Sequence, residues 1–387
     1  MTRWEHYILR AESIIREYDP TVPLHHFLKE FFRRNPKMGS NDRRQVSQLV
    51  YGYYRLGASS GFETTTTRIK VATYLFSDQE AYASLRPSEL QQNEFLSLDE
   101  KLTRLEQLYP SFNRIRIFPW QEYLSPSFPF EPFIYSFLTQ PSLFLRIRHL
   151  AKTEIEAKLV SNHIPFEWLG NHCLKLPNGT RTENLLPEGS FEVQDYSSQR
   201  TGVYFNPDHN ESWWDCCAAS GGKSLLLKDL EPSVRLAVSD IRNSVLENLV
   251  KRFKRAGHHV SSTQVIDLTR EPLSAKILGA PFDGIIVDAP CSGSGTWSRN
   301  PENLCYFNPE ILNDFHNRQL QIALNASRFL KPEGVLIYIT CSVFKKENED
   351  VIAELCHLSG LHLEKSELID GTGFSADSMF VARLKKN

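Results

Sequence analysis

The last half of this 387-residue chain alternates short apolar runs with amphipathic stretches. The runs SWWDCC, VRLAVSD, TQVIDL, FDGIIVDAP, VLIYITCS and SMFVARLKK have the length and apolar content of buried strands. Between them, GKSLLLKDL, NSVLENLVKRFKRAG, residues 308–334 and KENEDVIAELCHLSG have the apolar spacing of helices. This alternation predicts an α/β fold with a doubly wound, mostly parallel, Rossmann-like sheet.

The segments before this sheet differ in pattern. YILRAESIIREY and NDRRQVSQLVYGYYRLG have helical spacing, and a segment rich in proline and aromatic residues follows them up to about residue 141. SLFLRIRHL, HCLKLP and GSFEVQD then predict strands around a helix at TEIEAKLVSNHI. We therefore expect a helical N-terminal region with its connector at 1–137, a small α+β subdomain at 138–195, and the α/β domain at 196–387.

Composition excludes several classes of protein. The 44 Lys and Arg against 46 Asp and Glu give a net charge of −2, so nucleic-acid binding would depend on local basic patches. The seven cysteines lack paired ligand spacing, which argues against a metal site and favours reduced thiols. The start of the chain lacks the apolar core of a signal peptide, and nowhere do 18 apolar residues run together. We expect a cytoplasmic monomer without a membrane partner.

Four acids end, or nearly end, predicted strands: Asp215, Asp240, Asp267 and Asp288. Ligands of open α/β sheets bind beyond the carboxyl ends of the strands, where these acids would lie. The tract DCCAASGGKS, which starts at the first of them, follows a strand and opens a helix. Its glycines let the backbone approach a ligand, and the helix start favours a negative group.

The tract DCCAASGGKS is neither of the common phosphate-binding loops. Cys217 stands where a Walker A motif needs glycine, and GxGxxG is absent from it. Asp240, at the end of the next strand, can accept hydrogen bonds from two ribose hydroxyls. An adenosine-bearing cofactor without phosphates suits this combination, and S-adenosylmethionine is the natural candidate. A glycine-rich turn beside a solvated acid is the alternative that the motif alone leaves open.

Two cysteines follow neighbouring strands. Cys291 comes after Asp288-Ala-Pro, and Cys341 ends GVLIYITCS. A thiolate that adds to carbon 6 of cytosine turns carbon 5 into a nucleophile, and a carboxyl group can hold a proton on ring nitrogen 3. Asp288 would contact the base, while one cysteine attacks and the other assists release. The alternative is that each thiol is a small buried hydrophobe, which is the role we assign to Cys173, Cys216, Cys305 and Cys356.

These residues, together with VQDYSSQRTG, VSDIRNSVLENL, FDGIIVDAPCSGSGTWSRNPE and LKPEGVLIYITCSVFKKENEDVI, resemble the RsmB/Sun-type RNA (cytosine-5) methyltransferases in order and spacing. The resemblance runs from about Phe191 to the C-terminus. It implies that Cys341 is the attacking nucleophile, that Cys291 promotes product release, and that the small α+β subdomain binds RNA. It also places Asp267 near the adenine of S-adenosylmethionine, and Asp288 near both the cofactor and the base. The residues that it implies as S-adenosylmethionine contacts are Cys217, Ala218, Ala219, Ser220, Gly221, Gly222, Lys223, Asp240, Asp267 and Asp288.

The chain departs from the family pattern at several positions. Ser220 and Ser224 replace the usual proline and threonine of the cofactor loop, which are mild changes. Arg148 stands where asparagine is common, and Ser378-Met379 where Gly-Phe is usual. We expect these last regions to face RNA, so the departures bear on the choice of target.

A target cytosine has to be unpaired or flipped out of a duplex, so basic side chains must hold the RNA. Arg200, Arg299 and Arg318 lie near the predicted edge, and KRFKRAGHH, residues 251–259, is a second candidate that could also be a solvated helix face.

The sequence thus predicts an S-adenosylmethionine-dependent RNA (cytosine-5) methyltransferase, with ribosomal RNA favoured over transfer RNA by analogy. A non-catalytic RNA-binding or ribosome-assembly factor that retains the cofactor pocket is the alternative, and the intact thiols and loop disfavour it. An amino-methyltransferase would place Asn/Asp-Pro-Pro-Tyr/Phe after this strand, where the chain has DAPC.

Overall fold

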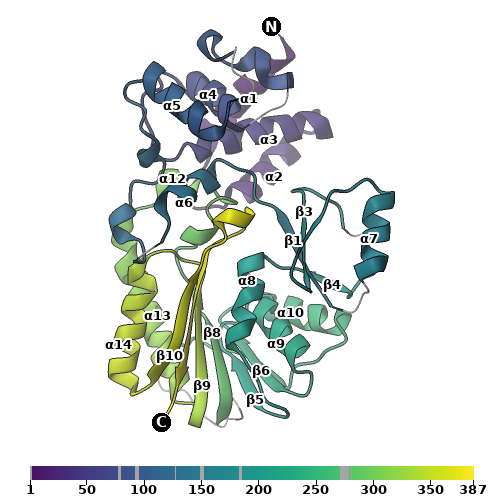
Figure 1. Ribbon diagram of the computed structural model, residues 1–387, viewed down its shortest axis with the longest axis vertical. Helices are drawn as coiled ribbons and strands as arrows, with labels where there is room; N and C mark the ends of the chain where they lie inside the picture. Colours follow the sequence, from purple (N-terminus) through teal and green to yellow (C-terminus); the bar gives the residue numbers. More distant parts are fainter. Residues whose placement is uncertain are drawn as a thin grey trace. The chain divides into compact units, whose positions relative to one another are not determined.

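The computed structural model describes residues 2–76, 80–91, 96–126, 128–148, 152–182, 185–270, 279 and 281–387. These divide into two compact units, which are labelled by element in Figure 1. The helical unit comprises Met1–Glu122, Pro129–Gln140 and Thr296–Pro309, and the sheet unit comprises Tyr123–Phe128, Pro141–Gly295 and Glu310–Asn387. The three-part division by residue range stays a prediction.

The sheet unit is built on a seven-stranded sheet with the order β10-β11-β9-β8-β5-β6-β7. Strands β5 to β9 pair in parallel, while β11 is antiparallel to both β9 and β10. This confirms the predicted α/β class. Strand order reverses between β5 and β8, which is where such sheets bind ligands. The strands are β5 (Ser212–Asp215), β6 (Arg235–Asp240), β7 (Ser262–Val265), β8 (Phe282–Asp288), β9 (Leu330–Thr340), β10 (His362–Ile369) and β11 (Met379–Lys385).

Helices cover both faces of this sheet. In Figure 1, α13 and α14 lie on one side of the strands and α9 and α10 on the other. Leu336 of β9 packs in the core on the α13–α14 side, and its neighbour Ile337 packs with α9 and α10. Burial on both faces explains why the central strands read as continuous apolar runs. The helices are α8 (Tyr196–Arg200), α9 (Gly222–Leu230), α10 (Asn243–Arg255), α13 (Leu312–Ser327) and α14 (Glu349–Ser359).

Two elements of this unit differ from the prediction. The helix expected over 308–334 ends at Ser327, and β9 already begins at Leu330. Leu330 pairs with Phe282 before the register shifts around the KPEG tract, where Glu333 has a positive φ of 62°. The tract is thus an irregularity inside a strand. Strand β10 was missed because it lies at the sheet edge and most of its side chains are exposed.

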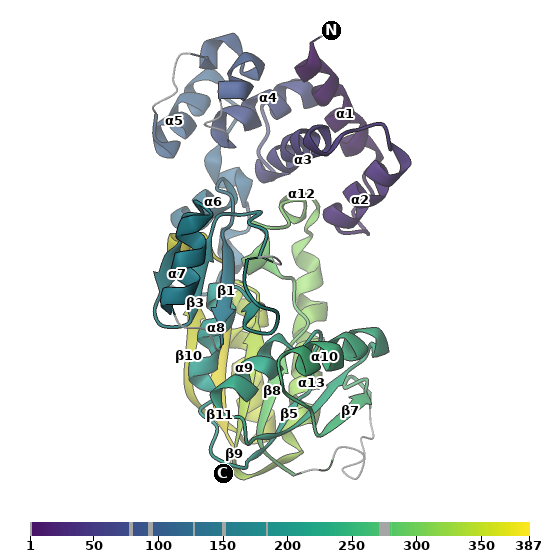
Figure 2. The ribbon, with the colours of Figure 1, turned by 90° about the vertical axis from the view of Figure 1, so that its right-hand side faces the viewer.

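A second, antiparallel sheet also belongs to the sheet unit, with the order β2-β3-β1-β4. Helix α7 (Lys152–Ser161) packs on it, as Figure 2 shows. Ile155 and Leu159 of this helix share a core with Leu145 and Leu174 of the strands. The strands are β1 (Leu143–Ile147), β2 (Glu167–Leu169), β3 (Cys173–Leu176) and β4 (Phe191–Val193).

The helical unit buries an aliphatic and aromatic core, in which α1 to α4 contribute Ile14, Leu28, Leu49 and Ile69. The loop after β8 belongs to this unit from Thr296 onward. None of the helices in the described ranges combines the length and apolarity that a membrane crossing requires. The helices are α1 (Arg3–Glu17), α2 (Leu24–Arg34), α3 (Ser40–Arg55), α4 (Thr65–Phe76), α5 (Leu98–Leu108), α6 (Phe130–Phe137) and α12 (Asn303–Tyr306).

Candidate active site

The carboxyl edge of the large sheet gathers the residues that the sequence singled out. Asp215, Asp240 and Asp288 are the last residues of β5, β6 and β8, and Asp267 lies two residues beyond β7. Cys341 directly follows β9, the strand that pairs with β8. Because these strands run in parallel, their ends place acids and thiols along one edge.

The loop from β5 to α9 turns sharply at its end. Ala219 and Gly221 have positive φ values of 45° and 85°. A Cβ atom at Gly221 would lie 2.8 Å from Leu249 Cγ, whereas one at Gly222 would meet nothing within 4 Å. Glycine is therefore needed at Gly221, directly before α9, and the start of a helix is a place where backbone N–H groups can bind a ligand.

Asp240 ties this loop to the end of β6. Its Oδ2 accepts a hydrogen bond from Ala219 N at 3.0 Å, and its Oδ1 accepts one from Arg242 N at 2.9 Å. Arg242 Nε donates a third hydrogen bond to Oδ1 at 3.2 Å. A carboxylate has about four lone-pair positions, so about one remains for a ribose hydroxyl.

Asp215 is buried below the loop. Ser224 Oγ, from the first turn of α9, donates to its Oδ2 at 2.5 Å. Burial raises the pKa of the Asp215 carboxyl to about 7. Ser224, which stands where the family commonly has threonine, keeps the hydroxyl that makes this bond.

Asp288 faces a buried lysine. Lys223 Nζ lies 3.5 Å from Asp288 Oδ2 and donates to Ser198 Oγ at 2.8 Å. The Asp288 side chain keeps 34% of its surface exposed, so it can still meet a ligand. Ser198, from the VQDYSSQRTG stretch, is a contact that sequence reasoning had not assigned.

Asp267 interacts with two residues of its own loop. Its Oδ1 accepts from Thr269 Oγ1 at 2.6 Å, and its Oδ2 lies 2.8 Å from Arg270 Nε. The Thr269 hydroxyl and the Arg270 charge lower the pKa of this carboxyl.

The side chains of the two strand-end cysteines are in contact. Cys291 Sγ and Cys341 Sγ are 3.3 Å apart, and both thiols are free and half-buried. The hydrogen bond with Cys341, together with burial, raises the pKa of Cys291 well above its ordinary value. A donor with a raised pKa stays protonated and can hydrogen-bond to a thiolate, so the arrangement suits a nucleophile with a partner thiol.

The polar cluster beside the thiols was not anticipated. Ser292 and Ser342 each follow one of the cysteines, and both bond the buried carboxylate of Glu347. The sequence KKENEDVI that carries Glu347 reads only as the start of a helix, so no local signal marked it.

Arg148, Ser378 and Met379, which lie in the regions expected to face RNA, have buried side chains. The Arg148 side chain is fully buried, with Nη2 2.6 Å from Asp229 Oδ1 of α9 and 2.8 Å from the carbonyl oxygen of Ala256. Ser378 and Met379 are buried at the end of the sheet. Arg148 is thus held by partners within the chain, and the expectation that these regions face RNA stays a prediction.

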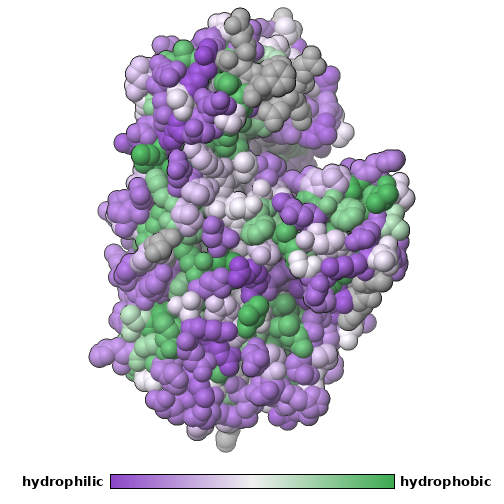
Figure 3. All heavy atoms as spheres, in the orientation of Figure 1, coloured by the Kyte–Doolittle hydropathy of each residue, from purple (hydrophilic) through white to green (hydrophobic). Residues whose placement is uncertain are grey.

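Of the basic residues near the predicted edge, Arg200 pairs with Glu367 at 2.8 Å and Arg299 lies in the helical unit. Arg318 is exposed on α13. In the 251–259 segment, Arg252 pairs with Glu192 at 2.7 Å. On the face that Figure 3 shows, hydrophilic residues prevail and apolar residues gather in smaller groups.

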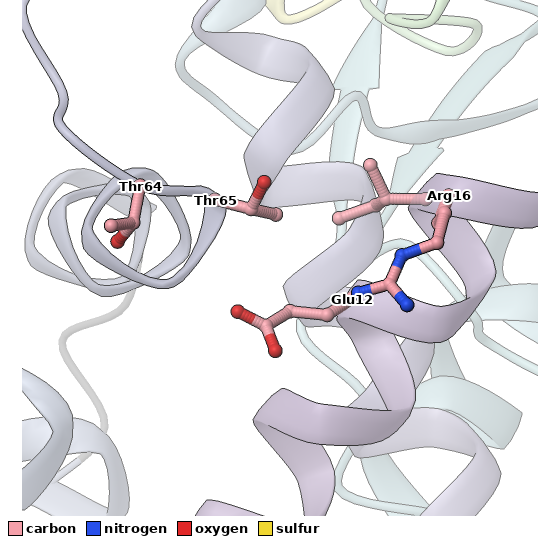
Figure 4. Close-up of a pocket in the computed structure, with 5 residues that line it drawn as sticks. Glu12, Arg16, Thr64 and Thr65 are labelled. Atoms are coloured by element: carbon pink, nitrogen blue, oxygen red, sulfur yellow. The ribbon is translucent and has the colours of Figure 1, made fainter.

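The helical unit carries a polar pocket of about 390 Å³, lined by Glu12, Ile15, Arg16, Thr64 and Thr65. In Figure 4, Glu12 and Arg16 of α1 lie opposite the two threonines. None of the predicted site residues lines it. Among the described residues, no group of three or more His, Cys, Asp or Glu side chains is arranged to hold a metal ion.

Residues 202–384 match the model of a family described as 16S rRNA methyltransferase RsmB/F. A ribosomal RNA small subunit methyltransferase B from Shewanella oneidensis is 29% identical over 257 residues, which are 65% of this chain and 55% of that protein. The enzyme of the same name from Xylella fastidiosa is 35% identical over 161 residues, 42% of this chain and 37% of that one. The chain thus spans about half, or less, of the curated relatives it matches.

Among solved structures, the protein PH0851 superposes with a TM-score of 0.71 at 21% identity, covering 98% of each chain, and so shares the fold. The family match confirms S-adenosylmethionine as the cofactor, and the tight turn at Gly221 and the spare acceptor capacity of Asp240 fit it. The match over residues 202–384 thus confirms the resemblance of this part of the chain to the RsmB/Sun-type methyltransferases.

Proposed function

We propose that the chain transfers a methyl group from S-adenosylmethionine to carbon 5 of a cytosine in RNA. The observation that carries the proposal is the pair of thiols, 3.3 Å apart at the ends of β8 and β9. Ribosomal RNA is the first candidate substrate, because the matched relatives are named as ribosomal RNA methyltransferases. Transfer RNA is the second.

In this proposal, Cys341 is the nucleophile that attacks carbon 6 of the cytosine ring. Its thiolate forms a bond to carbon 6, and the electron pair of the 5,6 double bond moves to carbon 5. Ring nitrogen 3 takes up the proton that the Cys341 thiol gave up, and the Asp288 carboxylate accepts a hydrogen bond from that N–H. The raised pKa of Cys291 supports the assignment, because Cys291 then remains the protonated partner of the pair. Without that proton-donating neighbour, the Cys341 thiolate would be less stabilised.

Release reverses the addition. After methylation, the proton on carbon 5 leaves to a base, and its electron pair restores the double bond. The carbon–sulfur bond to Cys341 then breaks, and ring nitrogen 3 gives up the proton that it took up in the addition. Cys291 lies in contact with the departing sulfur and assists this step. The departing sulfur leaves as a thiolate, which the Cys291 thiol can again stabilise by hydrogen bonding.

The cofactor would be held by the loop Cys217–Lys223 with Asp240, Asp267 and Asp288. Bound there, S-adenosylmethionine supplies an electrophilic methyl group. The backbone N–H groups at the start of α9 and the buried ammonium group of Lys223, 3.5 Å from Asp288, would orient this side of the site. Asp240 would accept a hydrogen bond from the ribose.

The test is methyl transfer to unmodified RNA. The purified protein is incubated with isotope-labelled S-adenosylmethionine and either ribosomal or transfer RNA, and the RNA is digested for mass spectrometry of nucleosides. We expect label in 5-methylcytidine. Label in another nucleoside would contradict the roles of the thiols, and cofactor binding without transfer to either RNA would favour the RNA-binding or assembly factor.

A further inference from the structure

Glu347 is a fully buried acid that the mechanism above leaves unused. It ends the turn of residues 345–347 between β9 and α14, and its side chain and backbone are 0% exposed. A buried carboxylate is costly unless it is well hydrogen-bonded, so its partners indicate what it holds.

These partners are the two cysteine-bearing loops. On the Cys291 side, Ser292 donates to Glu347 from its backbone N at 2.8 Å and from its Oγ at 2.5 Å. On the Cys341 side, Ser342 Oγ donates to the same Oε2. Ser292 and Ser342 are the residues directly after the two cysteines, so one carboxylate bonds the neighbours of both thiols.

Glu347 is itself held in place. Gln319 Nε2 donates to its Oε1 at 3.0 Å and also to the carbonyl oxygen of Pro290, the residue before Cys291. Tyr338 Oη donates to the Glu347 carbonyl oxygen at 2.7 Å. The acid therefore has one position, anchored by β9 and α13.

We propose that Glu347 is a positioning residue that clamps the Cys291 and Cys341 loops together, so that the two sulfur atoms stay in contact through attack and release. This inference rests on the proposed function for the roles of the thiols. Ser292 and Ser342 act with it as the bonded ends of the clamp.

The charge of Glu347 has a second effect. It lies close enough to Cys291 to contribute to the raised pKa of that thiol, after the hydrogen bond with Cys341 and burial. The clamp thus favours Cys291 as the protonated member of the pair.

The test uses the free protein and the thiol oxidant diamide. Diamide takes two hydrogens from a neighbouring thiol pair onto its nitrogen–nitrogen double bond and leaves a disulfide, and peptide mass spectrometry follows the Cys291–Cys341 bond. In Glu347→Ala the loops lose their clamp, which consists of three hydrogen bonds to Ser292 and Ser342. We expect disulfide formation to slow by about tenfold or more, because tenfold corresponds to a single lost buried hydrogen bond. In Glu347→Gln the amide oxygen can accept from Ser292 N, and the amide NH2 group can donate to the hydroxyls of Ser292 and Ser342. The contacts are then kept while the charge is lost, so we expect the parent rate or a faster one.

Glu349→Gln is the matched control, because Glu349 lies two residues away and bonds Ser125 instead of a cysteine loop. Its disulfide rate should equal that of the parent. Ser292→Ala, which removes one bond of the clamp and keeps the backbone N–H, serves if Glu347→Ala does not fold, and its rate should fall below the parent rate.

Equal rates in Glu347→Ala and Glu347→Gln, or a parent rate in Ser292→Ala, would overturn the clamp. The same variants are then assayed for methyl transfer, where we expect Glu347→Gln to restore most of what Glu347→Ala loses. Because the oxidation needs no RNA, a parent protein without methyl transfer would contradict the proposed function, while the oxidation rates would still support or overturn the clamp.

Discussion

At the scale of single residues, the large sheet carries carboxyl groups in different electrostatic settings at its two ends. Asp215 is buried and has a pKa of about 7, whereas the ion pair with Lys331 helps to hold the pKa of Asp283 below its usual range. Burial disfavours the charged form and a cation favours it, so two aspartates on adjacent strands titrate in different pH ranges.

Asp215 predicts a pH dependence of stability. Its pKa is about 7 in the folded chain and about 4 when unfolded. Because the folded pKa is the higher, its contribution is fully present below the unfolded value and is lost as the pH rises through 7. Asp215→Asn removes this titration, so the free energy of unfolding of the variant minus that of the parent should increase from pH 4 to 7, by at most about 1.4 kcal/mol per pH unit.

Urea unfolding of both proteins across this range measures the difference. Asp283→Asn is the control: its carboxyl is ionised in both states above pH 5, so the corresponding difference should be flat between pH 5 and 7. A flat difference for Asp215→Asn as well would show that the buried carboxyl does not titrate there.

The sequence predicted the place of a site residue where the residue lies next to a recognisable strand, and it did not where the contacts come from distant parts of the chain. The meeting of Cys291 with Cys341 was predictable, because both follow strands that could be expected to adjoin in a parallel sheet. The position of Glu347 was not predictable, since its partner Ser292 belongs to the loop after β8, 55 residues away in the sequence. The burial of the Arg148 side chain was not predicted, because its partner, Asp229, lies 81 residues away in the sequence.

At the scale of elements, the start of α9 sets the shape of the cofactor loop. Gly221 adopts a left-handed conformation as the residue before the helix, and Gly222 is the first helical residue. Only the former packs against α10, at Leu249. Two consecutive glycines therefore have different reasons to be there.

This difference predicts unequal effects of alanine. Gly221→Ala should lower the free energy of unfolding by about 1–3 kcal/mol, because an L-residue is strained at this φ and its Cβ would clash with Leu249. It should also weaken S-adenosylmethionine binding in calorimetry. Gly222→Ala should leave stability unchanged or raise it by up to about 1 kcal/mol, since alanine is the better helix former. Equal stability of the two variants would contradict the geometry of this turn.

Elements were predictable where burial imposes a pattern. The strands β5, β6, β8 and the core of β9 are buried on both faces, which gives the apolar runs seen in the sequence. Strand β10 has mostly exposed side chains and reads as polar, and the KPEG tract within β9 contains the Pro and Gly that usually end a helix. Both segments are strands because they pair with a neighbouring strand. The periodicity of apolar residues along the sequence does not show such pairing.

At the scale of the whole molecule, the chain combines a helical unit with a sheet unit that holds every predicted site residue. The segment after β8 carries Cys291 within the sheet unit and then, from Thr296 on, joins the helical unit. There Trp297 packs near Phe118 and Trp120, at ring distances of 6.0 and 5.8 Å. The loop that carries Cys291 thus continues along the chain into a segment of the helical unit. The domain boundaries predicted from the sequence had placed that segment in the α/β domain.

The division of labour between the two cysteines is the central claim, and covalent trapping tests it most directly. Parent, Cys291→Ala and Cys341→Ala proteins are incubated with S-adenosylmethionine and an RNA that the parent methylates, and denaturing gels detect protein joined to RNA. We predict that Cys291→Ala accumulates the adduct and that Cys341→Ala forms none and transfers no methyl group. An adduct in Cys341→Ala, or Cys291→Ala that turns over at the parent rate without one, would contradict the account.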